Sequence, residues 1–154
     1  MPLRDLSLTP AAVLESATLA EAVSALFESK VPAVAVVDGQ HRIVGILSER
    51  DVLGAVFPGY LVEIKHSAFL PDDTAALEDL AARARDRPVR DFVRRSDVLH
   101  ADDSLIHAAE RLLHSGEDAL PVVDGERFIG MLSVAGLCHA RLDGATTDSS
   151  AVQS

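Results

Sequence analysis

Residues 31–51, VPAVAVVDGQHRIVGILSERD, decide the fold of this chain. Two apolar runs, at 33–37 and 43–47, flank an Asp-Gly pair, and apolar runs separated by a tight-turn sequence indicate a β-hairpin. Ser48 follows the second run directly, and its hydroxyl is suited to cap a helix that begins there. The stretch therefore predicts a strand, a turn, a second strand and the start of a short helix.

The same pattern returns later in the chain. The stretch ALPVVDGERFIGMLSVAG, residues 119–136, again contains two apolar runs, at 119–123 and 128–132, around Asp-Gly, and Ser133 follows the second run. Near the N-terminus, LRDL at 3–6 returns as VRDF at 89–92. Self-similarity of this kind indicates two copies of one structural unit.

An amphipathic helix pattern precedes each hairpin. Thr18 followed by Glu21 is a capping-box pattern, and Ser104 stands at the equivalent place in the second copy. One apolar stripe follows each cap: Leu19, Ala22, Val23, Leu26 and Phe27, and then Leu105, Ala108, Ala109, Leu112 and Leu113. Short strands are expected before the helices, at 12–14 and 98–100. Each copy is therefore predicted to run strand, helix, strand, strand, helix.

The predicted fold class is α+β, with two β-α-β-β-α repeats packed as a pseudo-twofold pair. Neither copy holds enough apolar surface to close a core alone. We place repeat one at 1–57 and repeat two at 89–142. Between them, 58–88 is predicted to be an insertion with a surface helix from Thr74 to Arg85, and Pro88 prevents that helix from continuing. Residues 143–154 are small and polar and are expected to form a disordered tail.

Composition argues against several classes of protein. The 154 residues carry a formal net charge of −10, which disfavours a nucleic-acid partner because backbone phosphates need a basic surface. The single cysteine, Cys138, excludes an internal disulfide and is expected to be a small core residue. No apolar run suits a signal peptide or spans a bilayer, so we expect a cytoplasmic protein without a membrane segment.

Metal binding and catalysis are not supported by the residue spacing. Helix positions seven apart lie about 10 Å apart along the axis, too far to share one ion. This argues for exposed helix histidines rather than a metal site at the three histidines spaced by seven, His100, His107 and His114. A hydrolytic triad of Ser48, His41 and Asp51 has no spacing typical of a base and its orienting group. We expect no catalytic residue, no metal and no required cofactor.

The two repeats resemble a tandem pair of cystathionine-β-synthase (CBS) domains, also called a Bateman module. The resemblance rests on residues 31–53 and 118–137 with their preceding helices, and it covers the chain apart from the insertion and the tail. It implies a non-enzymatic regulatory module that binds an adenosine-containing ligand such as AMP, ADP or ATP between the repeats and signals by a conformational change. It also implies a homodimer formed through helices, where the chain carries extra alanines at Ala20, Ala25 and Ala55.

The family's diagnostic element matches GILSERD at 45–51. By this resemblance, Asp51 would accept hydrogen bonds from ribose hydroxyls, while Ser48 and the helix start would face ribose or phosphate, and Arg50 could add a contact to phosphate. Ser48-x-x-Asp51 is also a capping-box pattern, which stabilises a helix without any ligand. Both interpretations stay open, because one residue pair can serve both purposes.

The resemblance also implies that each ligand site is composite. Ser48, Arg50 and Asp51, with Ile46 beside them, would face the first strand of repeat two at Val98 and the start of its hairpin at Ala119, Leu120 and Pro121. A second, weaker site would pair Ser133 with Pro32, Ala33 and Val34. Gly136 takes the place there that Asp51 has in repeat one, and glycine cannot hold a ribose diol.

A ligand-free CBS pair that acts as a dimerising adaptor is the alternative function. The loss of the aspartate in the second motif favours it, and the intact Ser48 and Asp51 oppose it. In either case the protein partner is not identifiable from the sequence.

Overall fold

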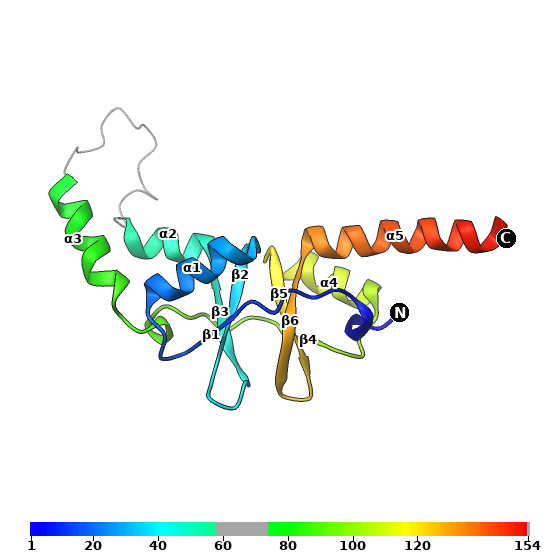
Figure 1. Ribbon diagram of the computed structural model, residues 1–154, viewed down its shortest axis with the longest axis horizontal. Helices are drawn as coiled ribbons and strands as arrows, with labels where there is room; N and C mark the ends of the chain where they lie inside the picture. The colour runs from blue at the N-terminus through cyan, green and yellow to red at the C-terminus, as the bar shows by residue number, and fades with distance from the viewer. Residues whose placement is uncertain (58–73, 154) are drawn as a thin grey trace.

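The computed structural model describes residues 1–57 and 74–153 and contains the two predicted repeats (Figure 1). The first consists of η1 (Leu3–Asp5), β1 (Ala12–Leu14), α1 (Leu19–Ser29), β2 (Ala33–Val37), β3 (Ile43–Ser48) and α2 (Glu49–Val56). After helix α3 (Thr74–Arg85), the second consists of η4 (Val89–Asp91), β4 (Leu99–His100), α4 (Leu105–Ser115), β5 (Ala119–Asp124), β6 (Arg127–Ser133) and α5 (Val134–Gln153).

Each repeat builds one three-stranded mixed sheet, and the two sheets have the same topology. The strand order is β1-β2-β3 in the first and β4-β5-β6 in the second. The outer strand of each pairs in parallel with the central strand, which forms the antiparallel hairpin with its successor. Both hairpins shift register at the same place, between Val36 and Val37 and between Val122 and Val123. The predicted α+β repeat is thus confirmed, including a shared irregularity.

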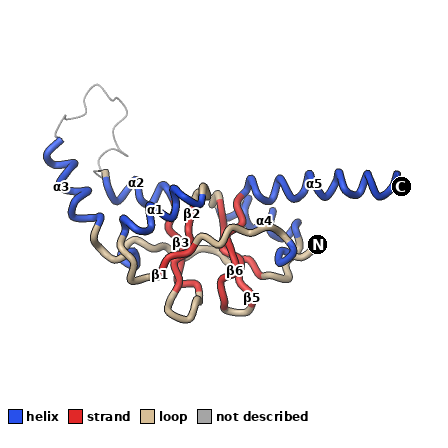
Figure 2. Tube along the Cα trace, viewed as in Figure 1, coloured by secondary structure: helices blue, strands red, loops and turns tan. Residues whose placement is uncertain are grey.

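The helices and the hairpin turns lie on opposite sides of the molecule. In the tube view α1, α2, α4 and α5 run along one side, while the turns of both hairpins point to the other (Figure 2). The two central sheets face each other between these layers, with contacts of β2 to β6 and of β3 to β5. The joint between the repeats is therefore made of strands.

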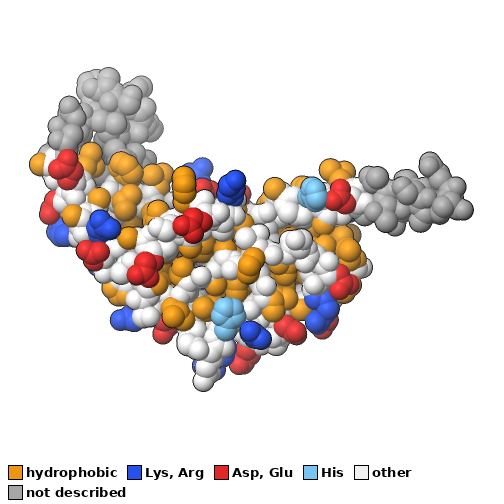
Figure 3. Space-filling view, viewed as in Figure 1, with side chains coloured by type: hydrophobic (Ala, Val, Ile, Leu, Met, Phe, Trp, Pro, Cys, Tyr) orange, Lys and Arg blue, Asp and Glu red, His pale blue; other side chains and the backbone are white. Residues whose placement is uncertain are grey.

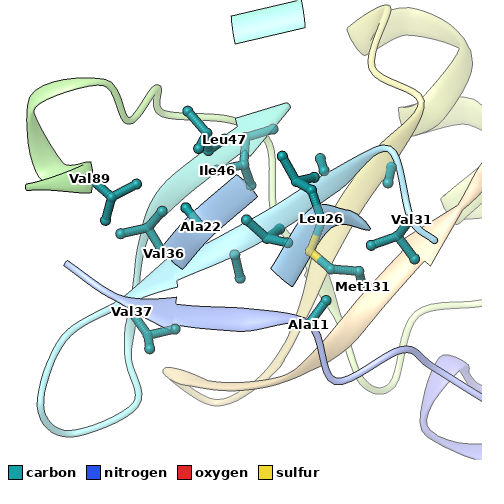
Figure 4. Close-up of a cluster of buried hydrophobic side chains, with 14 of the residues drawn as sticks. Ala11, Ala22, Leu26, Val31, Val36, Val37, Ile46, Leu47, Val89 and Met131 are labelled. Carbon is teal, nitrogen blue, oxygen red and sulfur yellow. The ribbon is translucent and has the colours of Figure 1, made fainter. Parts of the chain in front are cut away.

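The core of the first repeat is completed by side chains of the second. Met131 of β6 is 1% exposed and lies beside Ala11, Leu26 and Val31 (Figure 4). Phe128 and Ala119 of the second repeat belong to the same cluster. This confirms that the repeats pack as a pair rather than as two independent units.

The segments that open the two repeats are exchanged between them. Leu3 of η1 is fully buried in the core of repeat two, and the Arg4 N–H donates to the carbonyl of Ala101 at 2.9 Å. Val89 of η4 is fully buried in the core of repeat one, and its N–H donates to the carbonyl of Ala17 at 2.7 Å. Each repeat is thus closed by the segment that opens the other.

Both predicted helix caps form, but the buried stripes are narrower than predicted. Thr18 Oγ1 caps α1 and Ser104 Oγ caps α4, each accepting from the N–H three residues later. Phe27 and Leu113 were expected on the buried stripes, yet they are 86% and 82% exposed. Each helix rests on one sheet face, so the buried positions reduce to Leu19, Ala22 and Leu26 in α1 and to Ala108 and Leu112 in α4.

The C-terminal part of the chain differs from the prediction in two respects. Cys138 is exposed rather than in the core, because α5 turns Leu137 inward against the second core instead. Helix α5 also continues to Gln153, through the residues expected to form a disordered tail. No proline interrupts 134–153, and a glycine inside a helix costs only about 1 kcal/mol.

The predicted insertion helix is present as α3, which packs against α1 and α2. Ala84, near its end, is 4% exposed and joins the first core. The remainder of the predicted insertion, 58–73, lies outside the described residues.

Candidate functional site

The corner between β3 and α2 holds the Ser48 and Asp51 pair singled out by the sequence. Ser48 is the last residue of β3 and pairs with Ala33 of β2. Its Oγ accepts from the Asp51 N–H at 3.1 Å, and Asp51 Oδ2 accepts from the Ser48 N–H at 2.9 Å. The capping box is therefore complete, and the helix-stabilising interpretation of this pattern is realised in the structure.

Asp51 is also one end of an ion-pair network that joins the two repeats. Its Oδ1 accepts from Arg94 Nε at 2.7 Å. The Nη1 and Nη2 of Arg94 donate to the two carboxylate oxygens of Glu117 at 2.8 and 3.2 Å. Asp51 lies on α2, Arg94 follows η4, and Glu117 lies between α4 and β5. We call Asp51, Arg94 and Glu117 the bridging triad, because it links three segments that are distant in the chain.

The contacts within the bridging triad hold Asp51 and Arg94 in their charged forms. Burial by itself raises the pKa of Asp51, but the hydrogen bonds from Arg94 and Ser48 outweigh burial and hold this pKa below its usual value. Hydrogen bonds to Glu117 and then to Asp51 raise the pKa of Arg94 further above neutral pH. At neutral pH Asp51 and Arg94 therefore form an ion pair.

A cleft of about 330 Å³ opens beside the triad, in the lower part of the range for small-molecule sites. Its wall comes from both repeats and consists of Pro32, Ala33, Ser48, Glu49, Arg50, Asp51, Arg94, Gly116, Glu117 and Asp118. Three of the predicted ligand-binding residues, Ser48, Arg50 and Asp51, lie on this wall.

The other residues predicted for the first site do not line this cleft. Ile46 is fully buried, and its main chain exchanges hydrogen bonds of 2.8 and 3.0 Å with that of Arg94. Ala119, Leu120 and Pro121 are buried in β5. Val98 borders another groove, with Gly45 and Arg95. Repeat two instead contributes residues 116–118 to the wall near Ser48. Strand β4, which follows Val98, lies at the edge of its sheet, with β5 between it and β6.

Two residues predicted for the second site belong to the first cleft. Pro32 and Ala33 lie on its wall because Ala33 pairs with Ser48, and the Pro32 carbonyl accepts from the Glu49 N–H at 3.0 Å. Val34 is fully buried. The prediction placed these residues opposite Ser133, but the β2-β3 hairpin brings them to the corner of their own repeat.

The equivalent corner of repeat two keeps the cap and lacks the charge network. Ser133 Oγ accepts from the Gly136 N–H at 2.9 Å, as Ser48 does from Asp51. Where Arg94 crosses Gly45 in the first repeat, Leu8 crosses Gly130 in the second. This corner therefore has neither the carboxylate nor the guanidinium, so the two ends of the pair differ chemically.

The sequence did not predict five residues of the wall: Glu49, Arg94, Gly116, Glu117 and Asp118. Arg94 lies 43 residues from Asp51 and 23 from Glu117, and no spacing rule relates positions so far apart. The repeat alignment could have pointed to two of them. Glu117 and Asp118 stand directly before the second hairpin, where Val31 and Pro32 stand before the first.

Within residues 1–57 and 74–153, no group of three potential metal-ligating side chains comes together. His107 and His114 are exposed on α4, whereas His100 is exposed in β4 rather than on a helix. In the same part of the chain, no helix has the length and apolar character needed to cross a membrane.

Asp51→Asn is expected to lower the free energy of unfolding by about 1 kcal/mol at pH 7, since solvent screens the partly exposed triad. The folded-state pKa of Asp51 is depressed, so its stabilising contribution is present above the unfolded carboxyl pKa of about 3.9. This contribution to stability is lost as the pH falls through the folded-state pKa of Asp51. Urea titrations of both proteins from pH 7 to pH 3 should show the difference shrinking below about pH 4.

Asp102→Asn is the matched control, because the Asp102 side chain is 83% exposed in its pair with Arg4. It should change stability by less than about 0.5 kcal/mol across the same pH range. A stability difference for Asp51→Asn that stays constant down to pH 3 would show that the charge of Asp51 does not stabilise the fold.

Comparisons with known proteins agree with this architecture. The CBS domain model matches residues 3–58 and 88–143. CBSX2 from Arabidopsis thaliana is 24% identical in sequence, with a TM-score of 0.72 over 94% of this chain and 96% of its own. A structure of CBSX2 in complex with AMP is 25% identical, with a TM-score of 0.67 over 92% of this chain and 96% of its own.

A CBS domain from a CBS domain-containing membrane protein of Sphaerobacter thermophilus is 23% identical. Its TM-score is 0.70, over 90% of this chain and 86% of its own. No curated protein matches the chain. The family model accounts for more than half of the chain in two consecutive copies, and the similar structures share both repeats. The chain therefore belongs to the CBS domain family, as a tandem CBS pair.

Proposed function

We propose that this CBS pair is a non-enzymatic regulatory module that binds an adenosine-containing ligand in the cleft beside Ser48 and Asp51. The observation that carries the proposal is the position of Asp51, whose carboxylate lies on the wall of a cleft formed by both repeats. CBS pairs are generally regulatory modules, and a structure of the similar protein CBSX2 is a complex with AMP. A carboxylate on a cleft wall is suited to accept hydrogen bonds from two vicinal hydroxyls.

Signalling would follow from competition for Asp51. Oδ1 accepts from Arg94 and Oδ2 from the Ser48 N–H, so a ribose diol at this carboxylate would compete with Arg94. Arg94 also pairs with Glu117 of repeat two, so weakening its bond to Asp51 loosens a link between the repeats. The ligand would thereby favour a different packing of the pair, which a partner could distinguish.

Asp51→Ala is expected to abolish stabilisation by the ligand. In a thermal-shift panel of adenosine, AMP, ADP, ATP and S-adenosylmethionine, a ligand at 100 times its dissociation constant should stabilise the wild type by about 2.7 kcal/mol. Each variant is compared with its own ligand-free melting temperature, since Asp51→Ala also removes part of a helix cap. Asp102→Ala, at an exposed carboxylate outside the cleft, should keep the full shift. An unchanged shift in Asp51→Ala would contradict the site.

A ligand-free adaptor is the second candidate function, and one observation favours it. Both oxygens of Asp51 already accept hydrogen bonds within the chain, so the carboxylate does not need a ligand to be satisfied. If no compound in the panel raises the melting temperature while the protein remains a dimer in solution, the adaptor replaces the sensor.

A homodimer formed through the helices is part of both candidates. Large apolar side chains are exposed on or next to α1 and α2, with Phe27 at 86%, Leu53 at 55% and Phe57 at 42%. Hydrophobic side chains gather over the end of the molecule that carries α1, α2 and α3 (Figure 3). Of the alanines named from the sequence, Ala25 and Ala55 pack against the first core. We therefore assign the contact to the larger apolar side chains.

A further inference from the structure

The cleft is more acidic than a site for a phosphorylated ligand should be. Its wall carries four carboxylates and two guanidiniums, from Glu49, Asp51, Glu117, Asp118, Arg50 and Arg94. The formal charge of the wall is therefore −2. A field of one sign inside a cleft raises the local concentration of ligands of the opposite charge and lowers that of like-charged ones.

The cation that lies nearest to Asp51 is already engaged. All three nitrogens of the Arg94 guanidinium donate to carboxylate oxygens, one to Asp51 and two to Glu117. A phosphate that recruited Arg94 would leave two carboxylates without their cation, at 18% side-chain exposure each. Arg50 is the other cation of the wall, and Glu49 precedes it on an exposed first turn of α2.

The helix start offers little to a phosphate as well. Helix N-termini bind phosphate through backbone N–H groups that have no partner in the helix. At the start of α2, the N–H of Ser48 donates to Asp51, that of Glu49 to Pro32 and that of Asp51 to Ser48. Three of the donors that would hold a phosphate are therefore already used within the chain.

We infer that the cleft selects an adenosine derivative without a phosphate, uncharged or cationic at its 5′ end, and that Glu49 and Asp118 set this selectivity. The inference rests on the proposed function and names its ligand class. The cleft wall already holds one cationic group of the chain itself, the guanidinium of Arg94, between the carboxylates of Asp51 and Glu117. A cationic 5′ group is attracted by Glu49 and Asp118 on the same wall, whereas a phosphate dianion is repelled by them.

The test uses three compounds that share adenine and ribose and differ only at the 5′ position. Adenosine is neutral, 5′-amino-5′-deoxyadenosine is cationic near neutral pH, and AMP is anionic. Titration calorimetry of the full chain at low salt should give the tightest binding for the amine and the weakest for AMP, with adenosine at least about tenfold tighter than AMP. The preference should decrease as salt is added, because salt screens exposed charges.

Two double variants that change the net charge equally distinguish the effect of the cleft charges from the effect of the overall charge of the protein. Glu49→Gln with Asp118→Asn removes two carboxylates from the wall and leaves the bridging triad intact. It should reduce the preference for adenosine over AMP by about tenfold. Glu28→Gln with Glu126→Gln removes two exposed carboxylates that do not border the cleft, and should leave the preference unchanged.

The outcomes separate this inference from the proposed function. Tighter binding of AMP than of adenosine would overturn the inference while the proposed function stands. An equal loss of preference in both double variants would overturn the role of Glu49 and Asp118. If none of the three compounds binds, the proposed function fails and the inference fails with it.

Discussion

Gly45→Ala is expected to lower the free energy of unfolding by about 3 kcal/mol or more, because a methyl group at this position meets main-chain atoms. A Cβ built on Gly45 would lie 2.3 Å from the Arg94 carbonyl oxygen, 2.7 Å from Val93 Cγ2 and 3.0 Å from the Arg94 carbonyl carbon. Arg94 cannot simply move away, since its main chain exchanges two hydrogen bonds with that of Ile46. Urea unfolding followed by circular dichroism measures the loss.

Two other glycines provide controls for this prediction. Gly130 occupies the equivalent place in repeat two, and its Cβ would lie 2.5 Å from Leu8 Cβ, so Gly130→Ala should also destabilise strongly. Gly54 is exposed in the interior of α2, and apart from its own helix backbone no atom of residues 1–57 and 74–153 lies within 4 Å of its Cβ position. Gly54→Ala should therefore raise stability by about 0.5–1 kcal/mol through helix propensity. Similar stability of Gly45→Ala and Gly54→Ala would contradict the close approach of the Arg94 main chain.

Leu3→Ala is expected to cost about 3 kcal/mol, although Leu3 lies near the start of the chain. Its side chain is fully buried in the core of repeat two, with Leu99, Leu120 and Leu132. Removing it leaves a cavity in the repeat that is farther along the sequence. Thermal and urea unfolding of the full chain measure the loss, and the unfolding transition should remain single because the cores share residues of both repeats.

Leu14→Ala is the matched control, because Leu14 also belongs to repeat one but is 51% exposed. It should cost less than about 1 kcal/mol. If Leu3→Ala were equally mild, η1 would not be a structural part of the second core.

The local features of the fold were readable from the sequence. The hairpins follow from apolar runs around Asp-Gly, and the caps at Thr18, Ser48 and Ser104 depend on residues three positions apart. The sequence also showed that the aspartate of the Ser48 and Asp51 corner is replaced by Gly136 in the second repeat. The widths of the buried helix stripes were not readable, because Phe27 has the right helical position for burial and is nevertheless 86% exposed in the folded chain.

The walls of the cleft could not be predicted in the same way. Pro32 and Ala33 are predicted opposite Ser133 but line the cleft beside Ser48, since the sequence does not show which end of a hairpin faces which repeat. The role of Gly45 could not be read from the sequence either, because it lies within β3 and makes room for the main chain of Arg94. Both features depend on contacts between segments that are far apart in the chain.

The sequence by itself determined that the chain is a tandem repeat, that each copy has one β-hairpin and a capped helix, and that one copy retains the aspartate. These properties depend on interactions between residues a few positions apart, so they can be predicted from the spacing of residue types along the chain. Only the tertiary structure decided that η1 and η4 exchange repeats, that Arg94 joins Asp51 to Glu117, and that an acidic cleft opens beside them. The physical reason is that these contacts form when two sheets pack face to face, and packing brings together residues whose separation in sequence carries no signal.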